Sequence, residues 1–170
     1  AYGNTTGLSA CSPCEPGTAQ SLPGQQNCTA CLFGTATTLP SQSQCAACPV
    51  GTFSNVTGLL TCVECAAGTM QPLSGTSQCD QCTAGEYQDQ TGRTGCKLCT
   101  PGSVAPNNGT VQCDACAPGF AQSQPGFASC EECAAGRFAN ITGLATCDAC
   151  PVGRFTPSSG YLVCELCAAG

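Results

Sequence analysis

The chain has 170 residues, of which 20 are cysteine and none is histidine, and ten acids against four bases give a net charge of −6. Cysteine at this density is typical of a secreted disulfide scaffold, in which covalent links replace a large apolar core. Four scattered cations cannot form the basic face that nucleic-acid binding requires, and no apolar run approaches the roughly 20 residues of a spanning helix. We therefore expect neither nucleic-acid binding nor membrane insertion.

The cysteines form ten Cys-x-x-Cys pairs with a constant 17-residue period. The first members of the pairs are Cys11, Cys28, Cys45, Cys62, Cys79, Cys96, Cys113, Cys130, Cys147 and Cys164. An undeviating period of this kind indicates a one-dimensional repeat protein. We predict one tandem array over residues 1–170, with a weaker 85-residue repeat, 1–85 and 86–170, suggested by the match of Phe53-x-Asn55 with Phe138-x-Asn140.

In chain order, each unit reads Cys-x-x-Cys-x-x-Gly, six variable residues, a second Gly and three variable residues. The first glycine is present in all ten units, and the second is replaced only by Ser41. Glycine at fixed positions implies positive φ or close chain approach. Turn formers such as Pro23 and Asn108 precede the second glycine, so we predict a tight turn there between short extended arms.

These patterns predict a fold of small disulfide-rich repeats, an elongated rod of ten hairpin-like loops with short β segments. Twelve prolines and 21 glycines leave no room for a helix of useful length. Two residues after the first glycine, six of the ten units carry a large side chain, for example Phe53, Met70 and Tyr87. We expect this side chain to cover the adjacent disulfide, the alternative being a half-exposed residue at the surface.

Three hypotheses account for the cysteines. The first is structural disulfides, in which the second cysteine of one pair closes a 15-residue ring with the first cysteine of the next pair. Spacing alone leaves other connectivities open, such as a ladder that begins Cys11–Cys28. The consecutive scheme joins Cys14–Cys28, Cys31–Cys45, Cys48–Cys62, Cys65–Cys79, Cys82–Cys96, Cys99–Cys113, Cys116–Cys130, Cys133–Cys147 and Cys150–Cys164.

The second hypothesis is zinc, because two successive pairs have a spacing close to that of a four-cysteine site. Five such sites would add about −10 to a chain already at −6, without one histidine, and this charge argues against them. The third is thiol redox chemistry, which needs a low-pKa cysteine at a helix N-terminus and finds no helix here. We expect no metal and no cofactor.

Asn-x-Ser/Thr acceptor sequences support an oxidising, extracellular compartment. We predict covalent glycans at Asn4, Asn55, Asn108 and Asn140. Three of them, Asn4, Asn55 and Asn140, occupy the same place in their units, just before the expected turn. The sequon at Asn27 is less favoured, because the neighbouring cysteine is expected in a disulfide.

Catalytic chemistry finds little support, since the chain lacks histidine, the commonest general base. Seven of the ten acids lie between the cysteines of a Cys-x-x-Cys pair: Glu64, Asp80, Asp114, Glu131, Glu132, Asp148 and Glu165. Their regular spacing indicates a solvated acidic stripe. We predict that the protein is not an enzyme and has no catalytic residue.

The segment from Cys48 to Cys65, Cys-Pro-Val-Gly-Thr-Phe followed by Thr-Gly and Cys-Val-Glu-Cys, resembles the ephrin-receptor-like cysteine-rich repeat. It is also similar to the simplest loop module of tumour-necrosis-factor-receptor ectodomains, and the framework recurs in all ten units. In such modules the cysteine before the first glycine pairs with the next cysteine, so the resemblance implies the consecutive scheme. Long tandem arrays of this repeat resemble surface proteins of protists and other eukaryotic microbes.

In the consecutive scheme Cys11 and Cys167 have no partner, yet Gly170 would run into Ala1 without a change of phase. We therefore expect a window of a longer array or an end-to-end filament, with Cys11 and Cys167 bonded to adjoining repeats. The expected function is that of a structural extracellular glycoprotein, a stiff, glycan-coated and self-associating filament or stalk. The alternative is a receptor or adhesion ectodomain that binds a protein through its loop tips, for which we expect an apolar patch confined to a few neighbouring units.

Overall fold

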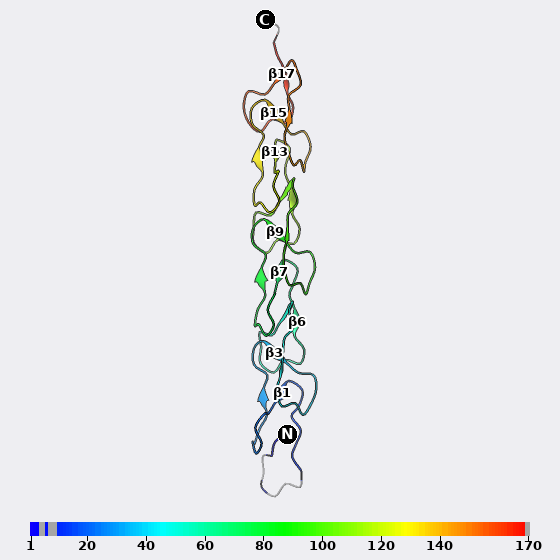
Figure 1. Cartoon of the computed structure of the whole chain (residues 1–170), viewed down its shortest axis with the longest axis vertical. Helices are drawn as coiled ribbons and strands as arrows, with labels where there is room; N and C mark the ends of the chain where they lie inside the picture. The colour runs from blue at the N-terminus through cyan, green and yellow to red at the C-terminus, as the bar shows by residue number, and fades with distance from the viewer. Residues whose placement is uncertain (4–5, 7–9, 169–170) are drawn as a thin grey trace. The chain divides into compact units, whose positions relative to one another are not determined.

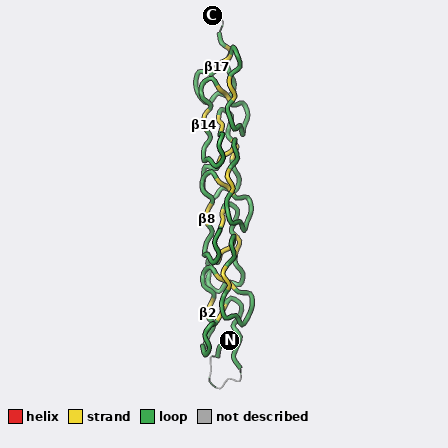
Figure 2. The backbone as a smooth tube through the Cα atoms, in the orientation of Figure 1, coloured by secondary structure: helices red, strands yellow, loops and turns green. Residues whose placement is uncertain are grey.

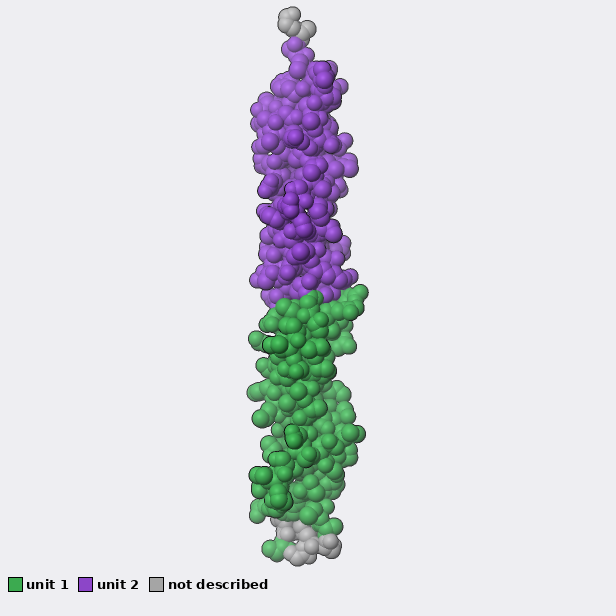
Figure 3. Space-filling model, in the orientation of Figure 1, with its two compact units in different colours: residues 1–80, 90–95 green, residues 81–89, 96–170 purple. Residues whose placement is uncertain are grey.

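The computed structural model describes residues 1–3, 6 and 10–168. It divides the chain into two compact units, residues 1–80 with 90–95 and residues 81–89 with 96–170 (Figure 3). The described residues form short strands and turns without a helix (Figure 1, Figure 2), which confirms the prediction of disulfide-rich repeats with little regular secondary structure. The predicted sequon at Asn4 lies outside the described residues.

Each strand is two residues long. The strands are β1 (Thr18–Ala19), β2 (Thr29–Ala30), β3 (Thr35–Ala36), β4 (Ala46–Ala47), β5 (Thr52–Phe53), β6 (Val63–Glu64), β7 (Thr69–Met70), β8 (Asp80–Gln81), β9 (Glu86–Tyr87), β10 (Lys97–Leu98), β11 (Ser103–Val104), β12 (Asp114–Ala115), β13 (Phe120–Ala121), β14 (Glu131–Glu132), β15 (Arg137–Phe138), β16 (Asp148–Ala149), β17 (Arg154–Phe155) and β18 (Glu165–Leu166). Successive strands form antiparallel hairpins, as in the pairing of β1 with β2 and of β17 with β18.

The second strand of every hairpin is the x-x dipeptide of a Cys-x-x-Cys pair. In the first full hairpin, Thr18 lies opposite Ala30 and Ala19 opposite Thr29. The two residues between the cysteines are therefore part of a sheet and do not form a flexible hinge between rings. The extended arms begin directly after the first glycine rather than beside the second.

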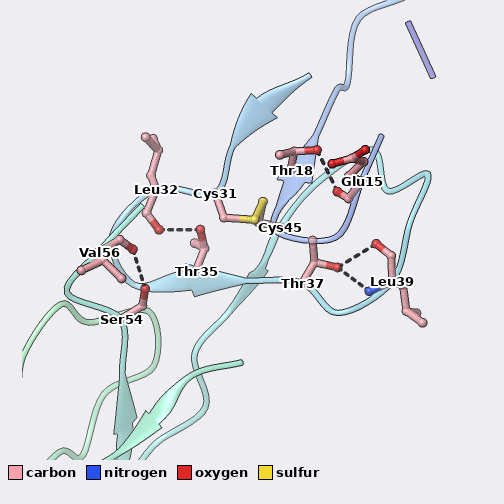
Figure 4. Close-up of a disulfide and its surroundings, with 10 residues drawn as sticks. All are labelled: Glu15, Thr18, Cys31, Leu32, Thr35, Thr37, Leu39, Cys45, Ser54 and Val56. Atoms are coloured by element: carbon pink, nitrogen blue, oxygen red, sulfur yellow. Dashed lines mark hydrogen bonds between the residues drawn. A yellow bond between two sulfur atoms is a disulfide. The ribbon is translucent and has the colours of Figure 1, made fainter. Parts of the chain in front are cut away.

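A tight turn at the first glycine leads into each hairpin. In the turn from Glu15 to Thr18, the amide of Thr18 donates to the carbonyl oxygen of Glu15 (3.1 Å), and Gly17 has φ +79°. Pro16 at the second position and positive φ at the third are typical of a type II turn. The hydroxyl of Thr18 donates to the same carbonyl (2.8 Å), and Thr35 repeats this bond to Leu32 (Figure 4).

Nine disulfides occur among the described residues, with Cα–Cα distances of 5.6–5.8 Å. They join Cys14–Cys28, Cys31–Cys45, Cys48–Cys62, Cys65–Cys79, Cys82–Cys96, Cys99–Cys113, Cys116–Cys130, Cys133–Cys147 and Cys150–Cys164. This is the consecutive scheme that the family resemblance implies. The sulfur atoms of these disulfides are not thiolates, whereas the zinc hypothesis and the redox hypothesis both require thiolates.

The core is thin and consists mainly of sulfur. The cysteine before the first glycine is fully buried in nearly every ring, for example Cys31 and Cys48. The large side chains expected to cover the disulfides are only half-buried, as at Phe53, or exposed, as at Phe155 (40%). The structure therefore favours the alternative of a half-exposed surface residue.

Candidate functional site

Backbone hydrogen bonds link each hairpin to the hairpins that follow it. In the first unit, the amide of Gly34 donates to the carbonyl oxygen of Ser54 (2.9 Å). The amide of Ser54 donates in turn to the carbonyl oxygen of Thr76 (3.2 Å), and the amide of Gly75 donates back to the carbonyl oxygen of Cys48 (2.8 Å). The partners in each bond belong to different repeats, so one hairpin is held by the next repeat and by the repeat before it.

The same three bonds recur in the second unit with other side chains. The amide of Gly102 donates to Gln122 (2.7 Å), the amide of Gln122 to Leu144 (3.3 Å) and the amide of Gly143 to Cys116 (2.8 Å). Because all six groups belong to the backbone, the side chains at these places vary without loss of the contact. The hairpins are therefore stacked by main-chain bonds within each unit and are not rings on a flexible string.

The first glycine also lies against the second glycine of a hairpin two repeats further along the chain. A Cβ atom at Gly34 would lie 2.1 Å from the carbonyl oxygen of Gly75, and one at Gly51 would lie 2.2 Å from that of Gly92. Both distances are far below van der Waals contact, so only glycine permits this approach. The first glycine thus meets two requirements, positive φ and close packing against backbone, whereas a Cβ atom on a second glycine would meet at most a side chain, such as that of Leu98 at Gly126 (2.9 Å). Ser41 takes the second-glycine position with φ +61°.

A buried polar side chain braces most loops from within. Gln71 is 4% exposed, its Nε2 donates to the carbonyl oxygen of Gln78 (2.9 Å), and its Oε1 accepts from the amide of Leu73 (3.0 Å). Gln20 and Gln122 make the equivalent pair of bonds. Sequence reasoning missed these residues. The signal was present, since the third position after the first glycine is always glutamine, threonine, serine, alanine or glycine.

Smaller residues replace this glutamine in the two described loops that carry the repeated sequon. Ser54 precedes Asn55 and donates to the carbonyl oxygen of Val56 (3.0 Å) (Figure 4), and Ala139 precedes Asn140. Asn55 and Asn140 are both exposed at the loop tip. Their position leaves room for a bulky glycan, and occupancy stays a prediction.

The other two sequons are tied into the framework. Asn108 is exposed, but its Oδ1 accepts the amide of Ala84 in the preceding repeat (3.0 Å), and the Thr110 hydroxyl donates to the carbonyl oxygen of Asn107 (2.7 Å). The carbonyl oxygen of Asn27 accepts from the Gln20 side chain, 2.9 Å away. These contacts single out Asn55 and Asn140 as the better placed acceptors.

The acids between the cysteines partly serve to join repeats. Glu64 accepts from the Thr91 hydroxyl (2.8 Å), and Glu132 accepts from that of Ser159 (2.5 Å). No three carboxylates or thiols gather into a possible metal site among residues 1–3, 6 and 10–168. A shallow hollow of about 350 Å³ beside Glu132 is lined by Arg137, whose guanidinium is engaged with the carbonyl oxygen of Cys147 (2.9 Å).

The tips of the loops differ along the chain. Two residues before the second-glycine position, four successive repeats of the first unit carry exposed aliphatic side chains: Leu22, Leu39, Val56 and Leu73, 48–65% exposed. The next three repeats carry Gln90, Asn107 and Gln124 at this position. In the repeat after that of Gln124 the position again carries an exposed aliphatic side chain, Ile141 (58%), so the apolar tips are not confined to one run of neighbouring repeats, as the receptor or adhesion alternative would require.

Cys11 and Cys167 are both exposed, and neither has a disulfide partner among the described residues. Long apolar helices of the kind that cross a membrane are absent from the part of the chain that the structure describes. The expectation that both cysteines bond to adjoining repeats stays a prediction.

Comparison with known families agrees with this geometry. Residues 39–78 and 136–170 match the family described as Tyrosine-protein kinase ephrin type A/B receptor-like. The chain is an array of tandem cysteine-rich repeats, and these two segments are similar to that family. The matched family is a receptor-like cysteine-rich one and not a catalytic one. Together with the disulfides, it indicates an extracellular or cell-surface module. No curated protein matches the chain.

Proposed function

We propose that the chain is a structural extracellular glycoprotein that forms a stiff, glycan-coated stalk or filament at the cell surface. The observation that carries the proposal is the repeated set of main-chain hydrogen bonds between hairpins, for example from Gly34 to Ser54 and from Gly75 to Cys48. A receptor-like module that only displayed independent loops would not need these bonds. A module that resists bending would.

The bonds favour stiffness because bending separates the hairpins that they join. Each net backbone hydrogen bond contributes about 0.5–1.5 kcal/mol. Inside a unit three such bonds join neighbouring repeats, as from Gly102, Ala105 and Gly126, in addition to the close glycine contact. Each hairpin is closed by its own disulfide, which limits local unfolding as a route to bending. Each unit by itself is longer than it is wide (Figure 3).

Glycans at Asn55 and Asn140 fit a coating role. Both side chains are exposed at loop tips and stand outside the bonds that join repeats. Treatment of the protein, secreted from a glycosylating host, with peptide N-glycosidase should remove about two glycan masses from these loops. Variants Asn55→Gln and Asn140→Gln should each remove one, and no mass change in either variant would contradict the coating.

Small-angle X-ray scattering of the oxidised chain tests the stalk directly. A compact 170-residue globule has a radius of gyration of about 15 Å, whereas a stiff array should give a clearly larger value with a rod-like scattering region. Reduction of the disulfides should abolish that region. A radius of gyration close to that of the compact globule, or the scattering of a flexible coil before reduction, would rule out the stalk.

A second candidate is an adhesion or receptor ectodomain that binds a protein through the apolar loop tips Leu22, Leu39, Val56 and Leu73. The exposed leucine and valine side chains at these tips have no role in the stacking bonds described above. Beads coated with the chain should then adhere to cells, and the variant Leu39→Ser/Leu73→Ser should lose that adhesion while it keeps its disulfides. Equal behaviour of the variant and the unaltered chain would leave the stalk as the better assignment.

A further inference from the structure

The loop tip that carries Asn55 is fastened at both ends to a turn of the preceding repeat. The amide of Gly34 in that turn donates to the carbonyl oxygen of Ser54 (2.9 Å), and the amide of Gly58 donates to the carbonyl oxygen of Cys31 (2.8 Å). One bond precedes the tip and the other follows it, and the two segments run in opposite directions. The tip is therefore held against the turn by main-chain bonds.

The bond from Gly34 to Ser54 brings the backbone of Phe33 next to that of Asn55. The donating amide belongs to the peptide group that follows Phe33, and the accepting carbonyl belongs to the peptide group that precedes Asn55. Standard backbone dimensions then place the Cα atoms of Phe33 and Asn55 within about 8 Å of each other. Both side chains are exposed. A sugar on Nδ2 of Asn55 therefore begins within reach of the phenyl ring.

The turn that faces this tip carries side chains unlike those of the other turns. Leu32 is 66% exposed and Phe33 58% exposed. At the same two positions the other nine units carry Glu-Pro, Pro-Val, Ala-Ala, Thr-Ala, Thr-Pro or Ala-Pro, and none of these pairs has two large apolar members. Val56 at the tip itself is 48% exposed (Figure 4). The stacking bonds use only the backbone here, so they do not account for this apolar surface.

The other described tip with the repeated sequon offers a natural contrast. Asn140 follows Ala139, whose carbonyl oxygen accepts from the amide of Gly119 (2.8 Å), as Ser54 does in the first unit. The turn that faces Asn140 carries Ala117 and Pro118. It presents no aromatic face and little apolar area. The same sequon thus meets a large apolar surface in the first unit and a small one in the second.

We propose that the first N-acetylglucosamine on Asn55 packs its apolar face on Phe33 and Leu32, so that the glycan is a structural part of this turn. The proposal rests on the glycan acceptor of the proposed function and deepens its role from a surface coat to a group that stabilises the fold. A pyranose ring has a face of C–H groups, and its contact with exposed apolar side chains removes their surface from water. A hollow of about 430 Å³ that Phe33 borders is also lined by Gln78 and Asp80, whose polar groups suit the sugar hydroxyls.

The attachment is the ordinary chemistry of a sequon. Its donor, by chemical class, is an oligosaccharide linked to a lipid diphosphate. One N–H bond of the Asn55 amide and the bond from sugar C1 to the diphosphate oxygen break, the Nδ2–C1 bond forms, and the proton leaves with the lipid diphosphate. Because the sugar is then tethered beside Phe33, the contact is intramolecular and needs little intrinsic affinity.

A matched exchange of the turn sequence tests the contact. The variant Leu32→Ala/Phe33→Pro copies the Ala-Pro pair that faces Asn140, so the turn keeps a sequence that the chain already uses. In protein secreted from a glycosylating host, loss of the glycan through Asn55→Gln should speed hydrogen exchange at the Gly34 amide about fivefold or more, because the turn opens more easily. In the Ala-Pro background the same loss should change exchange by less than about twofold.

Two measurements locate the effect in the first sugar. Trimming with an endoglycosidase that leaves one N-acetylglucosamine should keep the protection at Gly34, and the acetyl methyl resonance of that sugar should shift upfield beside the Phe33 ring. As a control, Asn140→Gln should leave exchange at the Gly119 amide unchanged. Protection lost on trimming, or a glycan effect at Gly119 equal to that at Gly34, would overturn the contact.

The outcomes separate this contact from the proposed coat. A glycan mass on Asn55 with equal effects in both turn backgrounds would refute the contact and leave the coat standing. Absence of any glycan mass on Asn55 would refute both, while the stalk is decided by scattering. If Leu32→Ala/Phe33→Pro abolished adhesion of coated beads to cells without any coupling to the glycan, the two side chains would belong to a protein-binding surface and the contact would be refuted.

Discussion

Substitution of a first glycine separates close packing from backbone conformation, because the chain offers a matched control. Gly34 has φ +76°, and its Cβ position lies 2.1 Å from the carbonyl oxygen of Gly75. Gly24 has φ +72° with open space around it. Gly34→Ala is therefore destabilised by both the strained backbone conformation and the steric overlap, whereas Gly24→Ala is destabilised by the backbone conformation alone.

The expected magnitudes follow from these geometries. A left-handed conformation costs an L-residue about 1–2 kcal/mol, and this term is common to both variants. Forcing an extra methyl group into a packed site costs about 1–3 kcal/mol more, and at Gly34 the obstacle is backbone, which cannot rotate away. Gly34→Ala should thus destabilise its surroundings by about 2–5 kcal/mol and Gly24→Ala by about 1–2 kcal/mol.

Native-state hydrogen exchange at the Gly75 amide measures the difference in local stability between the Gly34→Ala and Gly24→Ala variants. This amide donates to Cys48 (2.8 Å) and lies in the turn that Gly34→Ala displaces. A loss of about 1–3 kcal/mol corresponds to exchange about 5 to 150 times faster. Gly24→Ala should leave exchange at Gly75 unchanged. If both variants exchange alike at this amide, the close approach of the glycines contributes nothing to stability and the reasoning fails.

Two further substitutions test how a single loop is held. Gln71→Met keeps the length of the side chain but leaves the Leu73 amide and the Gln78 carbonyl oxygen without their partner, so local opening of this loop should become easier by about 1–3 kcal/mol in hydrogen exchange. Replacement of both Cys48 and Cys62 by serine opens one 15-residue ring and should cost about 3 kcal/mol in denaturant unfolding, with the other rings still oxidised by mass spectrometry. An unchanged exchange rate or an unchanged midpoint would contradict the corresponding role.

The periodic features could be predicted from sequence because each is local. A 17-residue period, glycine in every loop, proline in most loops and the lack of an apolar core define short hairpins without helices. Glycine columns indicated positive φ, and the structure has it at Gly34 and Gly75 alike. Ser41, with φ +61°, shows that the conformation belongs to the position in the repeat rather than to the residue.

The contacts between repeats could not be predicted, for a physical reason. Two-residue strands such as Thr29–Ala30 are too short to show hydrophobic periodicity, so no sequence pattern marks the x-x dipeptides as strands. Positive φ alone accounts for a glycine such as Gly34, so nothing local pointed to a second requirement that arises two repeats away. The one hint was that the first glycine is never replaced, whereas the second gives way once, to Ser41.

The division of labour between backbone and side chains explains how one framework can suit more than one surface role. Disulfides close each hairpin, and amides and carbonyls such as those of Gly75 and Cys48 join the hairpins. The side chains of Asn55, Leu73 and Gln124 enter neither set of bonds, so a loop tip can carry a glycan acceptor, a leucine or a polar residue without change to the stack. Since a first glycine packs against a turn two repeats ahead, opening one loop removes contacts over a span of three repeats. That reach makes the array mechanically continuous within a unit, while its surface remains free to vary from repeat to repeat.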